Sequence, residues 1–482
     1  MTPEEFRAYG HQLIDWIADY RASVADRPVM ARTEPGEIRA QLPKQPPIRP
    51  EPFADVLADL DSIVLPGLSH WQHPRFFGYF PSNGLLASVL GDYASTGLGV
   101  LGLSWQSSPA LTEVEEVVTD WMRQMVGLSD AWSGVIQDTA STSTLIALLS
   151  AREQATHYSL SRAGLQAEPK PLSVYVTAHA HSSVDKAALL AGLGRANIHI
   201  IPHDANYAMR PDALRARISH DVAAGFVPCA IVCTTGTTTS TAYDPLEQIV
   251  PVAKAFSVWL HVDAAMAGSA MILPELRHMW NGIEGADSIV INPHKWLGAA
   301  FDASLYYVRD PQHLIRVMST NPSYLRSSVD ERVKNLRDWG LPLGRRFRAL
   351  KLWFLIREQG VEGLQARLRR DLANAQWLAD QIRATPGWKI LAPVTLQTLC
   401  VRHEPAWLVG EPVEATGASE RIDAYTQAWA DRLNRSGAAY LTPAILDGRW
   451  MVRISIGAAP TEREHVAALW EAMQNETGRA EP

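Results

Sequence analysis

The segment Ser288-Ile289-Val290-Ile291-Asn292-Pro293-His294-Lys295-Trp296 is an apolar run that ends in polar residues, and it is the strongest indication of the fold. Its first four residues have the composition of a short strand that is buried on both faces. A second run, Val258-Trp259-Leu260-His261-Val262, ends on Asp263 in the same way. The pattern therefore predicts a lysine and an aspartate at the ends of two core strands.

Working outward, four more short apolar runs lie between residues 105 and 310, separated by segments with helical periodicity. They are Gly134–Gln137, Ser173–Thr177, Ala230–Thr234 and Ala303–Val308. Near-continuous apolar strands that alternate with helices predict an α/β fold with a mostly parallel sheet covered on both faces. Ligands in such sheets bind at the carboxyl ends of the strands.

The chain of 482 residues is too long for one compact core, so we expect several domains. Residues 1–82 form an expected N-terminal helical arm, in which Thr2 and Glu5 make a capping box. This arm covers either a partner subunit, as a dimerisation segment, or its own domain. Residues 83–355 form the expected large domain. Residues 356–482 form a small C-terminal α+β domain, with strands near Lys389–Ala392 and Trp450–Ile456.

Composition excludes several classes of partner. The net charge of −7 gives no basic field for nucleic acid or acidic lipid. Three scattered cysteines are too few for a disulfide framework or a zinc site, which predicts a reducing cytoplasm and no metal. We expect no membrane span, because no apolar run approaches about 18–20 residues. The acidic N-terminus lacks the basic region of a signal peptide.

Four strand ends carry polar residues that share one expected sheet edge. They are Asp138–Thr144, His179–Ser183, Thr234–Thr239, and Asp263 with Lys295, which follows it by 295 − 263 = 32 residues. Small hydroxyl residues at a helix start leave backbone N–H groups for a phosphate. Singly, each group has an ordinary explanation: a helix cap, a loop histidine or a surface lysine. Together they predict a reactive site.

The residue types at this edge suit a pyridoxal 5'-phosphate (PLP) enzyme. The Lys295 amine can form an imine with the cofactor's aldehyde. The Asp263 carboxylate can keep the pyridine nitrogen protonated, so that the ring accepts the electrons of a breaking bond. We expect the His181 ring to stack on the face of the cofactor.

A glycine pattern elsewhere imitates a dinucleotide site. Gly97-Leu98-Gly99-Val100-Leu101-Gly102 satisfies G-x-G-x-x-G, but no core strand precedes it and the sequence after it is loop-like. Because the motif binds a dinucleotide only between a strand and a helix, we reject a nicotinamide cofactor.

Several motifs together resemble the PLP-dependent group II decarboxylases, and most of all the aromatic-L-amino-acid (L-DOPA) decarboxylases. They are Asn292–Trp296, His261–Ala265, Ala180–Val184 and Tyr79–Pro81, and the similarity runs from the first helix to Val452–Ile456. The resemblance implies a PLP enzyme of fold type I (aspartate-aminotransferase-like). It also implies an obligate homodimer with sites at the subunit interface.

The resemblance also implies roles for individual residues. The catalytic set is Lys295, Asp263, His181 and Tyr324. Near the phosphate it places Thr139, Ala140, Ser141, Asn292 and His294, and around the ring Thr238 and Ala265. The substrate side chain would meet Trp71, Tyr79, Phe80, Pro81 and Ser82, with Leu101 and Leu103 contributed by the partner subunit.

The implied reaction is decarboxylation of an aromatic L-amino acid (L-DOPA, tryptophan, 5-hydroxytryptophan or tyrosine) to its amine and carbon dioxide. Tyr324, in a charged segment typical of an exposed lid, would protonate the α-carbon. An aromatic aldehyde synthase, which also deaminates oxidatively, is the main alternative. An acidic-amino-acid decarboxylase using Arg75 and an inactive PLP-binding dimer also stay open. Leu103 and Ser82 depart from the family pattern and leave substrate preference undecided.

Overall fold

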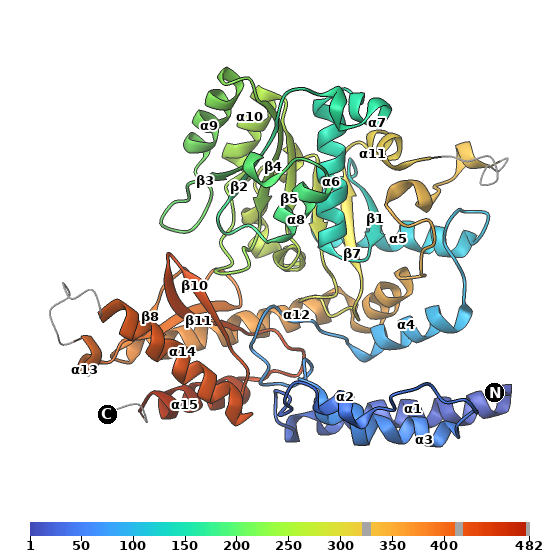
Figure 1. Cartoon of the computed structure of the whole chain (residues 1–482), viewed down its shortest axis with the longest axis vertical. Helices are drawn as coiled ribbons and strands as arrows, with labels where there is room; N and C mark the ends of the chain where they lie inside the picture. The colour runs from blue at the N-terminus through green and yellow to red at the C-terminus, as the bar shows by residue number, and fades with distance from the viewer. Residues whose placement is uncertain (321–328, 410–417, 479–482) are drawn as a thin grey trace. The chain divides into compact units, whose positions relative to one another are not determined.

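The computed structural model describes residues 1–320, 329–409 and 418–478 of the chain (Figure 1). The chain forms two compact units. Unit 1 contains Met1–Pro81, Ala373–Leu391 and Leu399–Pro482, and unit 2 contains Ser82–Leu372 and Ala392–Thr398. The expected division at residues 82 and 355 stays a prediction.

Unit 2 is built on a seven-stranded sheet with the strand order β1-β7-β6-β5-β4-β2-β3. Every adjacent pair is parallel except those that β7 makes with β6 and β1. The mostly parallel sheet is thereby confirmed. The strands are β1 (Ser133–Gln137), β2 (Leu172–Thr177), β3 (Ile198–Ile201), β4 (Val227–Thr234), β5 (Trp259–Asp263), β6 (Ser288–Ile291) and β7 (Ser304–Val308).

Strand β3 is the one strand of this sheet that the apolar runs did not predict. It lies at the edge of the sheet and pairs only with β2. Its side chains alternate between buried His199 and Ile201 and an Ile200 that is 56% exposed. The four residues lack the continuous burial of an inner strand, so their sequence does not form the continuous apolar run that predicted the other strands.

Helices cover both faces of the sheet in unit 2. Helix α6 (Ala140–Ala155) contacts five of the strands, and it packs with α8 (Ser183–Leu190) against β2 and β4 through Leu148, Val184 and Val174 (Figure 1). Helices α9 (Pro211–Ala223) and α10 (Leu246–Phe256) also pack on β4. The remaining helices of unit 2 are α4 (Leu86–Leu98), α5 (Pro109–Met125), α7 (Ser159–Ala163) and α11 (Pro311–Met318).

The rejected glycine pattern ends a helix. Residues 97 and 98 are the last of α4, and Gly99 closes the helix with a φ of +64°, a left-handed conformation that glycine adopts without strain. The strand that a dinucleotide site needs before its glycines is therefore replaced by a helix.

Unit 1 combines the two ends of the chain. Its small antiparallel sheet has the order β10-β11-β9-β8, with β8 (Trp388–Ile390), β9 (Thr398–His403), β10 (Thr442–Leu446) and β11 (Arg449–Ser455). The expected capping box of Thr2 and Glu5 opens α1 (Pro3–Ser23). The other helices are α2 (Glu37–Gln41), α3 (Phe53–Asp59), α13 (Ala406–Val409), α14 (Ala418–Ser436) and α15 (Arg463–Gly478). Helix α12 (Ala349–Ala384), which is interrupted at Gly360 by a non-helical backbone with a φ of +63°, runs through the boundary between the units. None of the helices in the described ranges is long and apolar enough to cross a membrane.

Candidate active site

The carboxyl ends of β5 and β6 bring Asp263 and the Lys295 turn together. The two strands are parallel neighbours in which Asp263 pairs with Val290. Beyond them the Asn292 N–H donates to the Ala265 carbonyl at 2.9 Å, and the Lys295 N–H donates to the Asn292 carbonyl at 2.9 Å. The Asp263 carboxylate is buried and accepts a hydrogen bond from the Ala265 N–H at 3.0 Å. Backbone hydrogen bonds therefore position both functional groups.

His181 belongs to the same edge, four residues beyond the end of β2. Its Nδ1 lies 3.1 Å from the Ser183 N–H, which donates to it, and 2.8 Å from Ser183 Oγ. Burial lowers the pKa of His181, the charge of Asp263 opposes that shift, and the charge of Lys295 adds to it. Both charges thus act on the imidazole.

The start of helix α6 offers an anion site at this edge. Thr139 is the N-cap, yet its side chain makes no capping hydrogen bond, so the first-turn N–H groups around Ala140 and Ser141 stay available. Ala140 packs with Ala265 and Val290 in one small cluster. This contact brings the α6 N-terminus, where the phosphate is expected, to the ends of β5 and β6.

Asn292 and His294 provide the test of whether the site fits a phosphate. The Oδ1 atom of Asn292 is buried and has no hydrogen-bond partner among the described residues. His294 is buried as well, and its Nδ1 accepts a hydrogen bond from the Ala303 N–H at 3.0 Å. The Asn292 Oδ1 atom can only accept a hydrogen bond, so it requires a donor and does not itself bind a phosphate oxygen. The donors that suit a phosphate are the free N–H groups at the start of α6 and the second ring nitrogen of His294. With these donors the residues present fit the phosphate of PLP.

Thr238 lies in the loop that follows β4. Its side chain is exposed, while Thr237 beside it is buried and bonded to Ser240 at 3.1 Å. The start of the loop is fixed by the buried Asp244, whose carboxylate accepts a hydrogen bond from the Thr234 N–H at 2.7 Å. The expected role of Thr238 near the cofactor ring stays a prediction.

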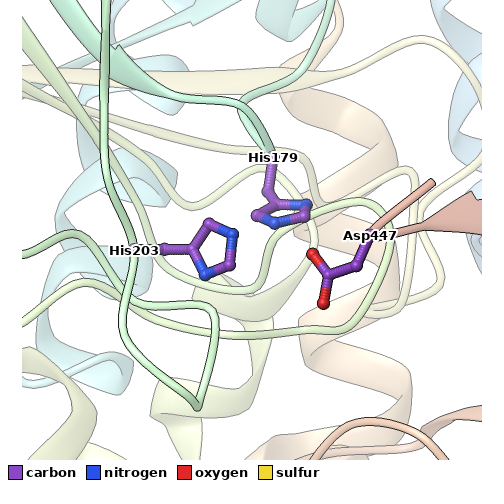
Figure 2. A group of neighbouring side chains, drawn as sticks. All are labelled: His179, His203 and Asp447. Carbon is purple, nitrogen blue, oxygen red and sulfur yellow. The ribbon is translucent and has the colours of Figure 1, made fainter.

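The structure separates two histidines that are close in the sequence. The His179 ring lies edge-on to His203 at 4.8 Å and to Tyr207 at 5.2 Å, whereas His181 is held by Ser183. Figure 2 shows His179 and His203 with their rings adjacent. Asp447, also labelled there, belongs to the turn between β10 and β11 of unit 1. His181 therefore remains the stacking candidate.

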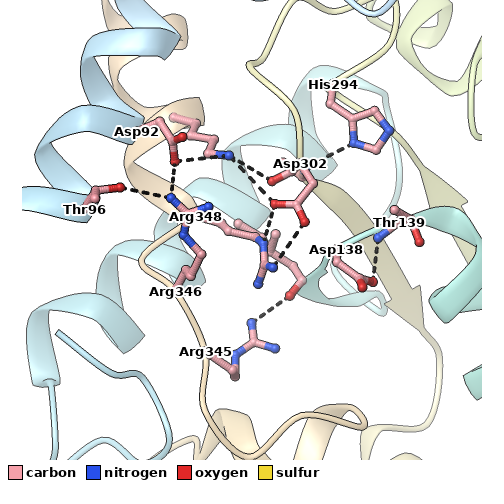
Figure 3. A network of polar contacts seen from close by, with 12 residues as sticks. Asp92, Thr96, Asp138, Thr139, His294, Asp302, Arg345, Arg346 and Arg348 are labelled. Carbon is pink, nitrogen blue, oxygen red and sulfur yellow. Dashed lines mark hydrogen bonds and ion pairs between the residues drawn. The ribbon is translucent and has the colours of Figure 1, made fainter. Parts of the chain in front are cut away.

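Two groups of residues that support the Lys295 turn escaped sequence analysis. The indole N–H of Trp296 donates to the buried Asp371 carboxylate at 2.9 Å, and Arg367 donates to the Trp296 carbonyl at 2.6 Å. The second group lies next to His294. The Arg348 guanidinium donates to the carboxylate of Asp302, the residue before Ala303, at 3.0 Å (Figure 3). The three arginines at positions 345–348 were the available signal for that group, but nothing local pointed to their partners.

The expected substrate residues of unit 1 form an aromatic cluster. Tyr79 stacks on Trp71 at 5.4 Å, and its hydroxyl accepts a hydrogen bond from Tyr440 at 3.0 Å. Arg453 lies 4.1 Å from the centre of the Phe80 ring and also donates to the Tyr79 carbonyl. Sequence analysis missed Tyr440 and Arg453, which follow Phe80 by more than 350 residues. Pro81 is buried next to this cluster.

The other expected substrate residues lie in unit 2 or outside the described residues. Ser82 and Leu103 are half-buried, and Leu101 is 58% exposed. The segment 101–103 is fixed by hydrogen bonds between Gly102 and Arg345 and between Leu103 and Arg337. Tyr324 lies outside the described residues. A joint pocket for cofactor and substrate stays a prediction.

Comparison with known proteins identifies the family. The model of the pyridoxal-dependent decarboxylase conserved domain matches residues 35–404. An aromatic-L-amino-acid decarboxylase of Catharanthus roseus is 37% identical, covering 99% of this chain and 94% of the relative. A tyrosine decarboxylase of Papaver somniferum is 36% identical, with 99% and 95% covered. The crystal structure of Oryza sativa TDC with PLP and tryptamine has a TM-score of 0.94 at 36% identity and covers 99% of both chains.

These likenesses confirm the expected family resemblance, the fold type I architecture with its small C-terminal α+β region, and PLP as the cofactor. The individual residue roles are not tested by them and stay predictions. With a family model that spans most of the sequence and relatives that span nearly all of it, this chain belongs to the pyridoxal-dependent decarboxylase family.

Proposed function

We propose that this protein decarboxylates an aromatic L-amino acid to the corresponding amine and carbon dioxide. The observation that carries the proposal is the gathering of Asp263, Lys295 and His181 at one sheet edge, with both charges acting on the imidazole. The aromatic class is supported by full-length relatives named aromatic-L-amino-acid, tryptophan and tyrosine decarboxylase. The aromatic cluster of Trp71, Phe76, Tyr79 and Tyr440 supports it too.

In this proposal the residues divide the work. Bound PLP supplies an electron sink for the bond that breaks. Lys295 provides the amine that attaches the cofactor, Asp263 holds the proton on its ring nitrogen, and His181 covers one face. The α6 N-terminus and His294 hold the phosphate, with Asn292 beside them. The chain's main contribution is to orient the substrate and to exclude water.

The main alternative is an aromatic aldehyde synthase. Relatives named phenylacetaldehyde synthase from Arabidopsis thaliana and a Rosa hybrid cultivar are both 37% identical to this chain. Overall identity therefore does not separate the two reactions. Tyr324 favours the decarboxylase, because a tyrosine that returns a proton to the α-carbon completes amine formation before oxygen can react.

We also propose a homodimer that works in the cytoplasm. Helix α4 presents Leu86, Leu90, Tyr93 and Leu98 on its exposed side, each at least 42% exposed, and Leu101 follows them. Apolar residues repeated at helical spacing on a surface suit a second protein surface. The three cysteines form no disulfide, which suits a reducing compartment.

The deciding experiment is product analysis by mass spectrometry. Purified enzyme with added PLP is given L-DOPA, tyrosine, tryptophan, 5-hydroxytryptophan and glutamate separately, while hydrogen peroxide is measured in parallel. Amine without peroxide from an aromatic substrate is the expected result. Aldehyde with stoichiometric peroxide would establish the aldehyde synthase. Turnover of glutamate alone would favour an acidic-amino-acid decarboxylase, in which Arg75 binds the side-chain carboxylate of the substrate. No turnover of any substrate would leave the inactive PLP-binding dimer.

A further inference from the structure

His294 is fixed in one hydrogen-bonding form. The Ala303 N–H donates to its Nδ1 at 3.0 Å, so a neutral ring must carry its hydrogen on Nε2. Burial, strengthened by the charge of Lys295, lowers the pKa of His294 to about 4, and the ring is therefore neutral at pH 7. The Nε2–H is then available as a donor to an anion, provided that Ala303 stays where it is.

The position of Ala303 depends on Asp302, which is clamped by two cations. Arg348 contacts both carboxylate oxygens of Asp302, at 3.0 Å from Nε and 3.3 Å from Nη2. Lys351 donates to the Asp302 backbone carbonyl at 3.1 Å. Burial alone would raise the pKa of Asp302, but the hydrogen bond and charge of Arg348 hold it below its ordinary value. The residue before Ala303 is thus held as a carboxylate by a forked contact.

The clamp is anchored on helix α4. Lys351 is fully buried and pairs with Asp92 at 3.2 Å, while Arg346 pairs with the same Asp92 oxygen at 3.1 Å (Figure 3). The Ala300 N–H donates to Ser88 of the same helix at 2.8 Å. A fully buried lysine is tolerated only when charges and hydrogen bonds compensate it, so these contacts have little freedom to rearrange.

We propose that Asp302, held by Arg348 and Lys351, is a positioning residue for the cofactor phosphate. It fixes Ala303 so that His294 Nδ1 is occupied and His294 Nε2–H is aimed as a donor. The inference rests on the proposed function, in which His294 contacts the phosphate. It adds a group of residues that never touch the cofactor and yet determine how well its phosphate is held.

The test compares two ligands on the apoenzyme. Dissociation constants are measured for PLP and for pyridoxal, which lacks the phosphate, from the quenching of tryptophan fluorescence. Asp302→Asn should weaken PLP by about tenfold, the value of one hydrogen bond to a charged group, while pyridoxal changes by less than about twofold. In a His294→Phe background the same substitution should change the PLP-to-pyridoxal ratio by less than about twofold, because the donor is already gone.

Arg346→Gln is the matched control. It removes a cation from the same network but leaves Asp302 clamped, so the ratio should stay at the wild-type value. Where Asp302→Asn fails to fold, Arg348→Lys keeps the charge and removes the fork, and the ratio should still fall. Equal weakening of both ligands, or an undiminished effect in the His294→Phe background, would overturn the inference. A wild-type apoenzyme with no preference for PLP over pyridoxal would instead contradict the proposed function.

Discussion

The cofactor edge of unit 2 and the aromatic cluster of unit 1 differ in how far they are buried. At the cofactor edge, Asp263 and the Lys295 turn are fixed by backbone hydrogen bonds at the ends of buried strands. The aromatic cluster also has backbone hydrogen bonds, such as that from the Phe77 N–H to the Tyr440 carbonyl at 2.9 Å, but the rings of Trp71 and Tyr79 are 38% and 48% exposed. A substitution at the buried edge disturbs the packing of the sheet. An exposed ring can be substituted without disturbing its neighbours.

The difference suggests a division of labour between the two regions. The cofactor edge defines the reaction, because its groups must be placed accurately against the cofactor. We propose that the aromatic cluster sets substrate preference, because stacking of rings tolerates changes in size and in hydroxyl groups. Substitutions in unit 2 should therefore change the rate or the product, and those in the unit 1 cluster should mainly change KM.

Lys295→Ala should produce the largest effect. Loss of the amine that attaches the cofactor should lower kcat by about 10⁴-fold or more and remove the visible absorbance of the bound cofactor. The measurements are steady-state kinetics and an absorbance spectrum. Lys186→Ala, which changes an exposed lysine of α8, is the matched control and should leave both unchanged. Retained turnover in Lys295→Ala would refute the assignment of the cofactor edge.

Tyr324→Phe should alter the product. Without the phenolic proton donor, amine formation should fall by about 10²-fold, as for loss of a general acid, and aldehyde with peroxide should appear. Product ratios by mass spectrometry check this. Tyr9→Phe on α1, which keeps the ring contact with Phe53 of α3, is the control that should stay a decarboxylase. An unchanged amine yield in Tyr324→Phe would mean that another group returns the proton.

His261 should make stability at the cofactor edge depend on pH. Burial lowers its pKa from 6.5 to about 4, although the nearby Asp263 charge opposes the shift. The unfolded chain therefore binds a proton that the folded chain does not, and the free energy of unfolding falls as pH falls from 6.5 to 4. His261→Gln should reduce this fall by up to about 3 kcal/mol. Urea unfolding at several pH values measures it, with exposed His11→Gln as the control. An identical pH dependence in His261→Gln and wild type would contradict the prediction.

Tyr440→Phe should give the smallest effect and should act on binding. It removes the hydrogen bond to the Tyr79 hydroxyl but keeps the ring contacts with Phe76 and Tyr79. A lost neutral hydrogen bond is worth about 0.5–1.5 kcal/mol, so KM should rise by about two- to tenfold while kcat stays unchanged. Tyr243→Phe in unit 2 is the control. A fall in kcat with constant KM would break the proposed division between the two regions.

Local patterns in the sequence were sufficient for much of the fold and part of the site. Burial in a sheet leaves an apolar signature within each strand, so the inner strands and the polar residues at their ends could be recognised singly. The capping box of α1 is local in the same sense. Edge strand β3 and strands β9 and β10 were missed. The burial of β3 alternates and β10 is mostly half-buried, whereas β9 has four buried residues in a row but begins with Thr398 and ends with Arg402 and His403, which are polar.

Contacts between distant residues could not be predicted in this way. The pairing of Asp302 with Arg348 joins residues 46 positions apart, and that of Tyr79 with Tyr440 joins residues 361 positions apart. A buried ion pair or a pair of hydroxyls leaves no periodic pattern in the chain. The partners become evident only when the backbone brings them within a few ångströms.

Local patterns in the chain predicted the chemistry: a lysine, an aspartate and a histidine that follow apolar strands, in motifs that resemble one family of PLP enzymes. The tertiary structure alone decided how those groups are supported. It joined both ends of the chain in unit 1, placed Arg453 beneath Tyr79 and Phe80, and set a clamped Asp302 behind His294. A buried strand requires apolar residues that are consecutive in the sequence, so its pattern is local. The charges and rings that support a site come from residues far apart in the sequence, and only folding brings them into contact.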